Sequence, residues 1–503
     1  MKKIGFALRM LFVLAVLSAC LAGERTEAAI FSADTLRVAL TSEPPSLTTC
    51  DHDSLISVGQ NLLSFNGLVR IDHATLKPEM DLAESYTVEN DVDWIFKLKK
   101  GVKFHNGDGF TAADVKATIE YAKKVPGSTL YTGRIKSIEA VDDYTVKMTT
   151  YEPYAGLLYD MGYHYNFIMP KALIESGHDF NRNPVGTGPY KLVDWNLGTS
   201  LTYVANEDYF DPGHKAKIKN LIFMVIPEGP SRAIALEAGE VDFVWEVSGA
   251  DVANLQSNPE IKVLKVETVD NVQLFLNNDV APFDDVNVRN AINYGINRQN
   301  IIDGALNGIG VPNSTAIAMG YWGSTTRDAA SYDPEKAKEF LAKWGGDPLT
   351  IELPILCSNE TRVSIATVIQ SDLAQLGIKV KVIAMDTATY FAKWSGGDYV
   401  GVLASWSPSN SLTYVQRYHS ERRKAFPGSC NDKLIDELVL KAEKTIDEEK
   451  RLGLIEDIVA RVNQISPQIS LFQSVWVRAF HSQLEGVVCS GTGYTAFNDM
   501  YWK

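Results

Sequence analysis

Residues 332–386 read YDPEKAKEFLAKWGGDPLTIELPILCSNETRVSIATVIQSDLAQLGIKVKVIAMD and carry the clearest periodic pattern in the chain. Their apolar residues predict a helix that ends at Gly345, a strand over 349–355, a second helix that ends at Gly377 and a second strand over 378–382. Two strands joined by a helix form a βαβ unit, in which the strands lie parallel with a right-handed crossover. Open sheets of this kind bind ligands beyond the carboxyl ends of their strands. The stretch therefore predicts an α/β fold and the edge of the sheet where a ligand binds.

The first half of the chain is richer in strands. Alternating apolar residues predict strands over 94–98 and 146–148, and a helix begins at Thr111, where Asp114 completes a capping box. No repeat and no Pro- or Ser-rich linker separates this half from the βαβ unit. We therefore expect closely connected lobes with mixed sheets.

The composition is that of a globular chain with enough apolar residues for large cores. Its 503 residues are 45% hydrophobic and 22% charged, and the net charge is −14. At roughly 100–200 residues per domain, this length corresponds to about two to four lobes with room for a cleft. Nucleic-acid binders need clustered Lys and Arg, and the sequence has no basic block, so nucleic acid is not an expected partner.

The first residues have the features of an export signal. Positive residues precede an apolar run over 10–17, so we interpret residues 1–19 as a signal peptide. The LSAC motif that ends at Cys20 resembles a bacterial lipoprotein box, in which Cys20 becomes the lipidated first residue; cleavage after Ala28 or Ala29 is the alternative. No later apolar run approaches the ~18 residues that cross a bilayer. We expect a periplasmic or extracytoplasmic protein, with or without a lipid anchor.

Catalytic and metal-binding motifs are missing from the sequence. It contains no HExxH zinc site, no GxSxG nucleophile elbow and no GxxxxGK[ST] phosphate loop. The four cysteines that follow Cys20 stand apart rather than in CxxC pairs, which argues against zinc. Three disulfide pairings are open, and free buried thiols are the alternative. We therefore expect no enzyme, no cofactor and no metal.

Four segments match a known family in order and spacing. They are WIFKLKKGVKFHNGDGFTAADVKATIEY (94–121), PVGTGPYKL (184–192), the block over 281–302 that begins APFDDV, and YDPEKA (332–337). They resemble the family 5 extracytoplasmic solute-binding proteins of ABC importers, the class that includes dipeptide, oligopeptide, nickel and opine binders. The resemblance covers essentially the whole mature chain.

The resemblance implies an α/β fold of two lobes around a ligand cleft, the class II type of periplasmic binding protein. In the family layout residues 32–269 form the first lobe, 270–476 form the second, and 477–503 return to the first. The apolar runs over 272–276 and 469–477 suit strands that cross between the lobes. The layout also places two cysteines in each lobe, which suggests two disulfides: Cys357–Cys430 and Cys50–Cys489.

The implied function is that of a receptor that performs no chemistry. Such a protein captures a small molecule or peptide outside the cytoplasm and, as a monomer, delivers it to ABC permease subunits with cytoplasmic ATPases. The expected solute is a small peptide or a related amine or carboxylate compound. The alternatives are a nickel-chelate or opine binder, or a ligand-binding sensor subunit that reports to a membrane kinase or chemoreceptor.

The family places a pocket tryptophan in the segment GVLASWSPSN (401–410), which makes Trp406 the best candidate for ligand contact. Ser407 and Asn410 follow it as hydrogen-bonding candidates. In peptide-binding members an Asp shortly after this tryptophan pairs with the amino terminus of the ligand, but this loop has no acid, and Asp386 is the nearest substitute. We therefore expect dipeptides with free amino termini to bind less well than solutes with a blocked amine, a carboxylate or a neutral polar group.

Other candidates for ligand binding come from both lobes. Each has a side chain that can stack on a ligand, form hydrogen bonds or hold a carboxylate: Tyr163, His164, His52, Asp53, Arg134 and Arg417. Ordinary packing or solvation is the alternative for each of them. His164 and His419 also suggest a nickel chelate, although two isolated imidazoles are weak support for a metal site.

Overall fold

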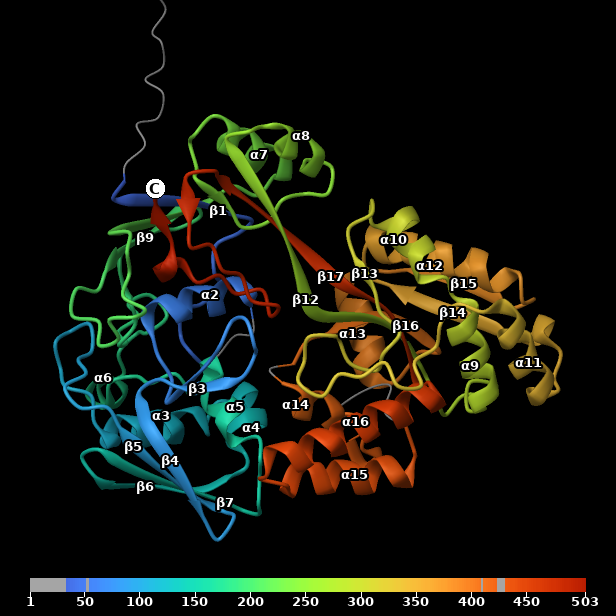
Figure 1. Cartoon of the computed structure of the whole chain (residues 1–503), viewed down its shortest axis with the longest axis horizontal. Helices are drawn as coiled ribbons and strands as arrows, with labels where there is room; N and C mark the ends of the chain where they lie inside the picture. The colour runs from blue at the N-terminus through green and yellow to red at the C-terminus, as the bar shows by residue number, and fades with distance from the viewer. Residues whose placement is uncertain (1–32, 51–53, 409, 423–429) are drawn as a thin grey trace, which may run out of the picture.

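The computed structural model describes residues 33–50, 54–408, 410–422 and 430–503. In Figure 1 these residues form two lobes joined by two long strands, β12 (Ile261–Leu276) and β17 (Gln468–His481). Both strands belong to one continuous sheet that extends into both lobes. Its strands run in the order β15 (Lys379–Ala384), β14 (Glu352–Cys357), β16 (Gly401–Trp406), β12, β17, β11 (Phe243–Val244), β1 (Thr35–Leu40), β10 (Asn220–Val225), β9 (Ser200–Ala205) and β8 (Tyr190–Asn196), and β13 (Val311–Pro312) pairs with β17. The predicted two-lobed α/β fold with mixed sheets is confirmed.

The two long strands pair antiparallel, with an interruption near their middle. Glu267 pairs with Val475, and pairing resumes with Asn271 opposite Gln473. Three residues of β12, 268–270, therefore stand opposite Ser474 alone, which is a β-bulge that bends the strand and increases its twist. The apolar runs predicted to cross between the lobes lie within these two strands.

A second, antiparallel sheet lies in the first lobe. Its order is β4 (Ala83–Glu89), β5 (Asp93–Leu98), β7 (Thr145–Thr150) and β6 (Ile135–Asp142), and α3 (Ala112–Ala122) packs against it. The alternation predicted in β5 is confirmed, because Trp94, Phe96 and Leu98 are all buried. The predicted capping box is also present: the Thr111 N–H donates to Asp114 Oδ2 at 2.8 Å.

The predicted βαβ unit forms in the second lobe. α11 (Pro334–Trp344) begins after Asp333, which accepts a hydrogen bond from the Lys336 N–H, and α12 (Glu360–Ala374) connects the parallel strands β14 and β15. The first strand starts at Glu352, later than predicted. Asp347 caps a 3₁₀ turn, η3 (Pro348–Thr350), which removes Leu349 from the strand and leaves it exposed.

The remaining elements connect and cover these sheets. In the first lobe they are α2 (Leu55–Ser64), β2 (Val69–Ile71), β3 (Pro78–Met80), η1 (Pro126–Ser128), α4 (Thr129–Thr132), α5 (Leu157–Met161), η2 (His164–Asn166), α6 (Lys171–Ser176), α7 (Gly229–Glu237), α8 (Val252–Ser257), β18 (Leu484–Glu485), η5 (Phe497–Asp499) and β19 (Tyr501–Trp502). In the second lobe they are α9 (Val286–Gly295), α10 (Arg298–Ala305), α13 (Thr387–Gly396), α14 (Ser411–Gln416), η4 (Ser420–Arg422), α15 (Lys433–Lys444) and α16 (Glu448–Ile465).

The lobes also touch away from the crossing strands, where α15 lies beside α4 and β7 in Figure 1. Arg134 Nη2 is 3.5 Å from Glu443 Oε1, and Lys444 Nζ is 3.0 Å from Glu152 Oε2. The Ala155 N–H donates to the Glu443 carbonyl oxygen at 2.9 Å. These contacts hold the two lobes against each other in this conformation.

The structure contains neither predicted disulfide. Cys357, Cys430 and Cys489 are free thiols. Cys357 is buried at the end of β14, whereas Cys430 packs in the separate cluster around α15 and α16. Cys489 forms a hydrogen bond with Thr495, whereas Cys50 is buried in another cluster of the first lobe. The pairings are wrong because sharing a lobe does not bring two cysteines into the same packed cluster.

The structure tests one of the two predictions that concern the membrane. None of the helices in its described residues is both long and apolar enough to span a bilayer. The signal peptide over 1–19 and Cys20 lie outside the described residues.

Asp81, at the start of the connection from β3 to β4, predicts how stability depends on pH. Asn66 Nδ2 donates to its Oδ2 at 2.9 Å, and burial raises its pKa to about 6 because the charged carboxylate loses its hydration. Since this pKa is raised on folding, the stabilising contribution is complete below the unfolded pKa and is lost as the pH rises through about 6.

Asp81→Asn should therefore raise the free energy of unfolding at pH 8 by roughly 1–3 kcal/mol and change it little at pH 4. Urea unfolding at both pH values measures this. An equal loss of stability at the two pH values would show that the carboxylate is stabilising in its charged form.

Candidate ligand-binding site

The site is built at the carboxyl ends of β14 and β16. These strands are parallel, so the residues that follow them, 358–362 and 407–408, emerge at the same edge of the sheet. The bulge of β12 lies at this edge too, because Asn271 pairs with Trp406. Open α/β sheets bind ligands at such an edge, as the sequence predicted for this unit.

Trp406 is the last residue of β16, and the side chain of Arg417 lies against its ring. The Arg417 guanidinium is buried and stands within 4.8–5.6 Å of four ring centroids, those of Phe275, Trp406, Tyr414 and Tyr418. Its Nη2 donates to Gln468 Oε1 at 2.7 Å, whereas its Nε and Nη1 have no hydrogen-bond partner among the residues that the structure describes. Cation–π contacts of this kind hold an aromatic ring in place. Arg417 thus supports Trp406 from within the lobe.

The loop after Trp406 is held by the second lobe. Ser407 is exposed at its start, and the Tyr321 hydroxyl donates to the Pro408 carbonyl oxygen. Asn410 is buried and caps α14, where its side chain accepts a hydrogen bond from the Thr413 N–H at 2.8 Å. Of the two predicted polar candidates, Ser407 is therefore the one that is exposed to solvent at the sheet edge, whereas the side chain of Asn410 caps α14.

Two charged residues at this edge escaped the sequence analysis. Asp270, in the bulge of β12, is partly buried and accepts a hydrogen bond from Ser474 Oγ at 2.7 Å. Arg362 lies in the first turn of α12, with its guanidinium 5.2 Å from the centroid of the Tyr390 ring. Burial raises the pKa of Asp270, and the positive charge of Arg362 opposes that rise. Within the described part of the chain, neither residue forms an ion pair at 4.0 Å or less.

An aromatic cluster in the first lobe includes two of the predicted candidates, Tyr163 and His164. Tyr163 stacks on Tyr131 with a centroid distance of 4.2 Å, and His164 lies 4.4 Å from Tyr163. His164 is buried, whereas Tyr163 is only partly so. Tyr163, rather than His164, is therefore the residue of this pair with part of its surface exposed to solvent.

Tyr321, in the second lobe, lies near enough to this cluster for Tyr131 to affect its pKa. Burial is the main reason that the pKa of Tyr321 is raised, and Tyr414, Asp270 and Tyr131 act in the same direction. Tyr131 belongs to the first lobe and the other three to the second. The aromatic cluster and the carboxylate of Asp270 thus lie on the same junction between the lobes.

The other candidates are placed elsewhere. Arg134 belongs to the contact between the lobes, where Glu152 and Glu443 already compensate its charge. Asp386 caps α13 by accepting a hydrogen bond from the Thr389 N–H at 2.9 Å. His52 and Asp53 lie outside the described residues. The Nδ1 of His419 accepts from the Glu421 N–H, and among the described residues no three His, Cys, Asp or Glu side chains gather as a metal site.

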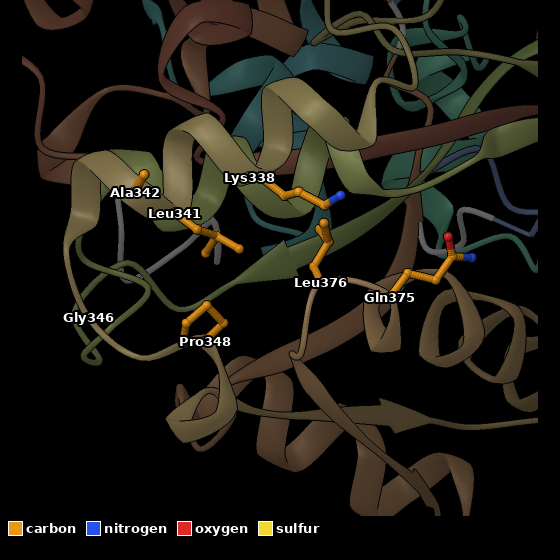
Figure 2. Close-up of a pocket in the computed structure, with 7 residues that line it drawn as sticks. All are labelled: Lys338, Leu341, Ala342, Gly346, Pro348, Gln375 and Leu376. Carbon is orange, nitrogen blue, oxygen red and sulfur yellow. The ribbon is translucent and has the colours of Figure 1, made fainter.

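A cavity of about 260 Å³ lies at a different place, between α11 and the turn after α12, and Figure 2 shows the residues that line it. Its lining residues are Lys338, Leu341, Ala342, Gly346, Pro348, Gln375 and Leu376. The lining has no aromatic side chain, and in Figure 1 α11 lies at the end of the second lobe far from β12 and β17. We therefore place the candidate site at the junction of the lobes and not in this cavity.

Comparison with known proteins agrees with this geometry. Heme-binding protein A of Haemophilus influenzae is 27% identical over 478 residues, which cover 86% of each chain. Di/tripeptide-binding protein 1 of Pseudomonas aeruginosa is 30% identical over 435 residues, which cover 78% of this chain and 79% of that protein. The periplasmic binding protein DppA of Helicobacter pylori, solved with the peptide STSA, has a TM-score of 0.77 and 26% identity, and the match covers 93% of this chain and 98% of that one.

These likenesses show the two-lobed fold of periplasmic binding proteins, which the sequence predicted. The model of the bacterial extracellular solute-binding proteins, family 5, matches residues 77–424, well over half of the sequence. The chain therefore belongs to the family 5 bacterial extracellular solute-binding proteins.

Proposed function

We propose that this protein is the receptor of an ABC importer that captures a small peptide or a related amine or carboxylate solute. The observation that carries the proposal is the combination at one sheet edge of an aromatic ring, Trp406, with two opposite charges, Asp270 and Arg362, that do not pair with each other. Ligand sites combine apolar walls with a few polar groups that fix orientation. The peptide ligands named for two of the related proteins support the same class of solute.

The protein performs no chemistry in this proposal, and binding acts through the arrangement of the lobes. Residues 32–269 and 477–503 form one lobe and 270–476 the other, so that the bulge over 268–270 lies where β12 passes between them. A solute that contacts both lobes favours the closed arrangement, which then docks on the permease. The receptor works outside the cytoplasm, held at the membrane surface through Cys20.

Closure gives the first test of the receptor function. Small-angle scattering of the purified protein should show a smaller radius of gyration when a mixture of dipeptides is added, because the solute bridges the lobes. Sucrose at the same concentration serves as the control. A radius that stays the same while calorimetry reports saturation would argue against closure.

Trp406 gives a test of the location of the site. Trp406→Ala should weaken binding of the solute that co-purifies with the protein, identified by mass spectrometry, by about 2 kcal/mol or more in calorimetry. Trp195→Ala removes a tryptophan from β8 in the first lobe and should leave the affinity unchanged. Equal affinities of the two variants would place the site elsewhere.

Anchoring is tested by a third variant. Cys20→Ala removes the thiol that lipidation requires, so the protein should move from the membrane fraction to the soluble extracytoplasmic fraction of the producing bacterium. Cell fractionation with immunoblotting measures this. Membrane association that persists in Cys20→Ala would reject the lipid anchor.

A further inference from the structure

The β-bulge of β12 turns the side chain of Asp270 into a position where two other strands hold it. Ser474 Oγ of β17 donates to Asp270 Oδ2 at 2.7 Å, and Ser405 of β16 is a second hydrogen-bonding neighbour. The Asp270 N–H donates to Thr268 Oγ1 at 3.1 Å, which fixes the backbone of the bulge. The carboxylate therefore has a defined direction, set by three adjacent strands.

Among the described residues, no Lys, Arg or His forms an ion pair with Asp270. Hydroxyl donors from Ser474 and Ser405 satisfy part of a carboxylate, which can accept about four hydrogen bonds. Arg362 acts on it only from a distance, and burial raises the pKa of Asp270. A carboxylate removed from water is costly unless a counter-charge reaches it. The site is thus incomplete without a cation.

The surroundings indicate what kind of cation completes it. Asn271, the next residue, pairs with Trp406, and the charge of Asp270 also reaches Tyr321. Arg362 lies at the same edge and opposes a second positive charge, so a compact primary ammonium fits better than an extended dication.

We propose that Asp270 binds the primary ammonium group of the solute, in place of the acid that is missing after Trp406. The proposal rests on the proposed receptor function and narrows its solutes to those with a free amine, such as the amino terminus of a peptide. It replaces the expectation from sequence that the site has no counter-charge and that blocked amines bind better. Asp270 is then a specificity-determining residue of the site.

The test uses two probes, a mixture of dipeptides and the same mixture after N-acetylation, with the full mature protein. Native mass spectrometry and calorimetry compare the wild type, Asp270→Asn and the control Asp386→Asn. Asn keeps a side-chain oxygen that accepts from Ser474, and it also caps a helix well in the control. Thermal unfolding of each variant shows whether it is folded.

We expect the wild type and Asp386→Asn to prefer free over acetylated dipeptides by about tenfold or more, and Asp270→Asn to lose this preference. If the wild type binds both mixtures equally, or if Asp270→Asn keeps the preference, the role of Asp270 is overturned while the receptor function stands. If neither mixture binds to the wild type, the peptide class of solute and the role of Asp270 fall together.

The preference for free over acetylated dipeptides is a ratio measured on one protein sample, so partial unfolding of a variant does not change it. Should Asp270→Asn fail to fold, Asp270→Glu provides the second variant. It keeps the charge but moves it by one methylene, and it should retain a preference for free amines with weaker binding. A preference that disappears in Asp270→Glu, with the fold intact, would contradict a direct ion pair.

Discussion

The pairing of β12 with β17 is the constraint on which the rest of the structure depends. These two strands join the lobes and lie at the centre of the main sheet, so every other strand of that sheet is positioned relative to them. Their register changes at the bulge, where three residues of β12 oppose Ser474. A bulge increases local twist, and here it separates the part of the sheet that belongs to the first lobe from the part that carries the βαβ unit.

Such an interruption leaves backbone groups without ladder partners, and the side chain of Gln473 and the backbone of Gly491 supply them. Gln473 Nε2 donates to the carbonyl oxygens of Thr268 and Met319 at 2.7 and 2.8 Å, and Gln473 Oε1 accepts from the Met319 N–H. The Val269 N–H donates to the Gly491 carbonyl oxygen at 2.8 Å. Because buried backbone groups are costly when unpaired, these bonds allow the bulge to persist in the middle of the sheet. Ser474, which follows Gln473, then holds the carboxylate of Asp270.

Local patterns were enough to predict the elements that depend on neighbouring residues. The caps at Thr111 and Asp333 and the parallel pair β14–β15 follow from short-range hydrogen bonding and periodicity, and all three are present. The site could not be predicted in this way, because it is formed by contacts between segments that are far apart in the sequence. Asp270 was missed because it lies within a strand, and the sequence gives no sign of the bulge that places its side chain near the ligand-binding edge. Arg417 was predicted to hold a carboxylate of the ligand, a role that stays untested, whereas the structure shows its contact with Trp406.

The position of the site within the bulge bears on how binding and closure are coupled. The contacts between the lobes near α15 include exposed ion pairs, such as Lys444 with Glu152, and pairs of this kind contribute at most about 1 kcal/mol each. Contacts this weak oppose a change in the angle between the lobes only slightly, so a solute that binds one arrangement more tightly shifts the population. Asp270 lies on the strand that bends between the lobes, and Ser474, which holds it, lies on the other crossing strand. A cation drawn to this carboxylate therefore acts on the segment whose geometry sets the angle between the lobes, and binding and closure share the same few residues.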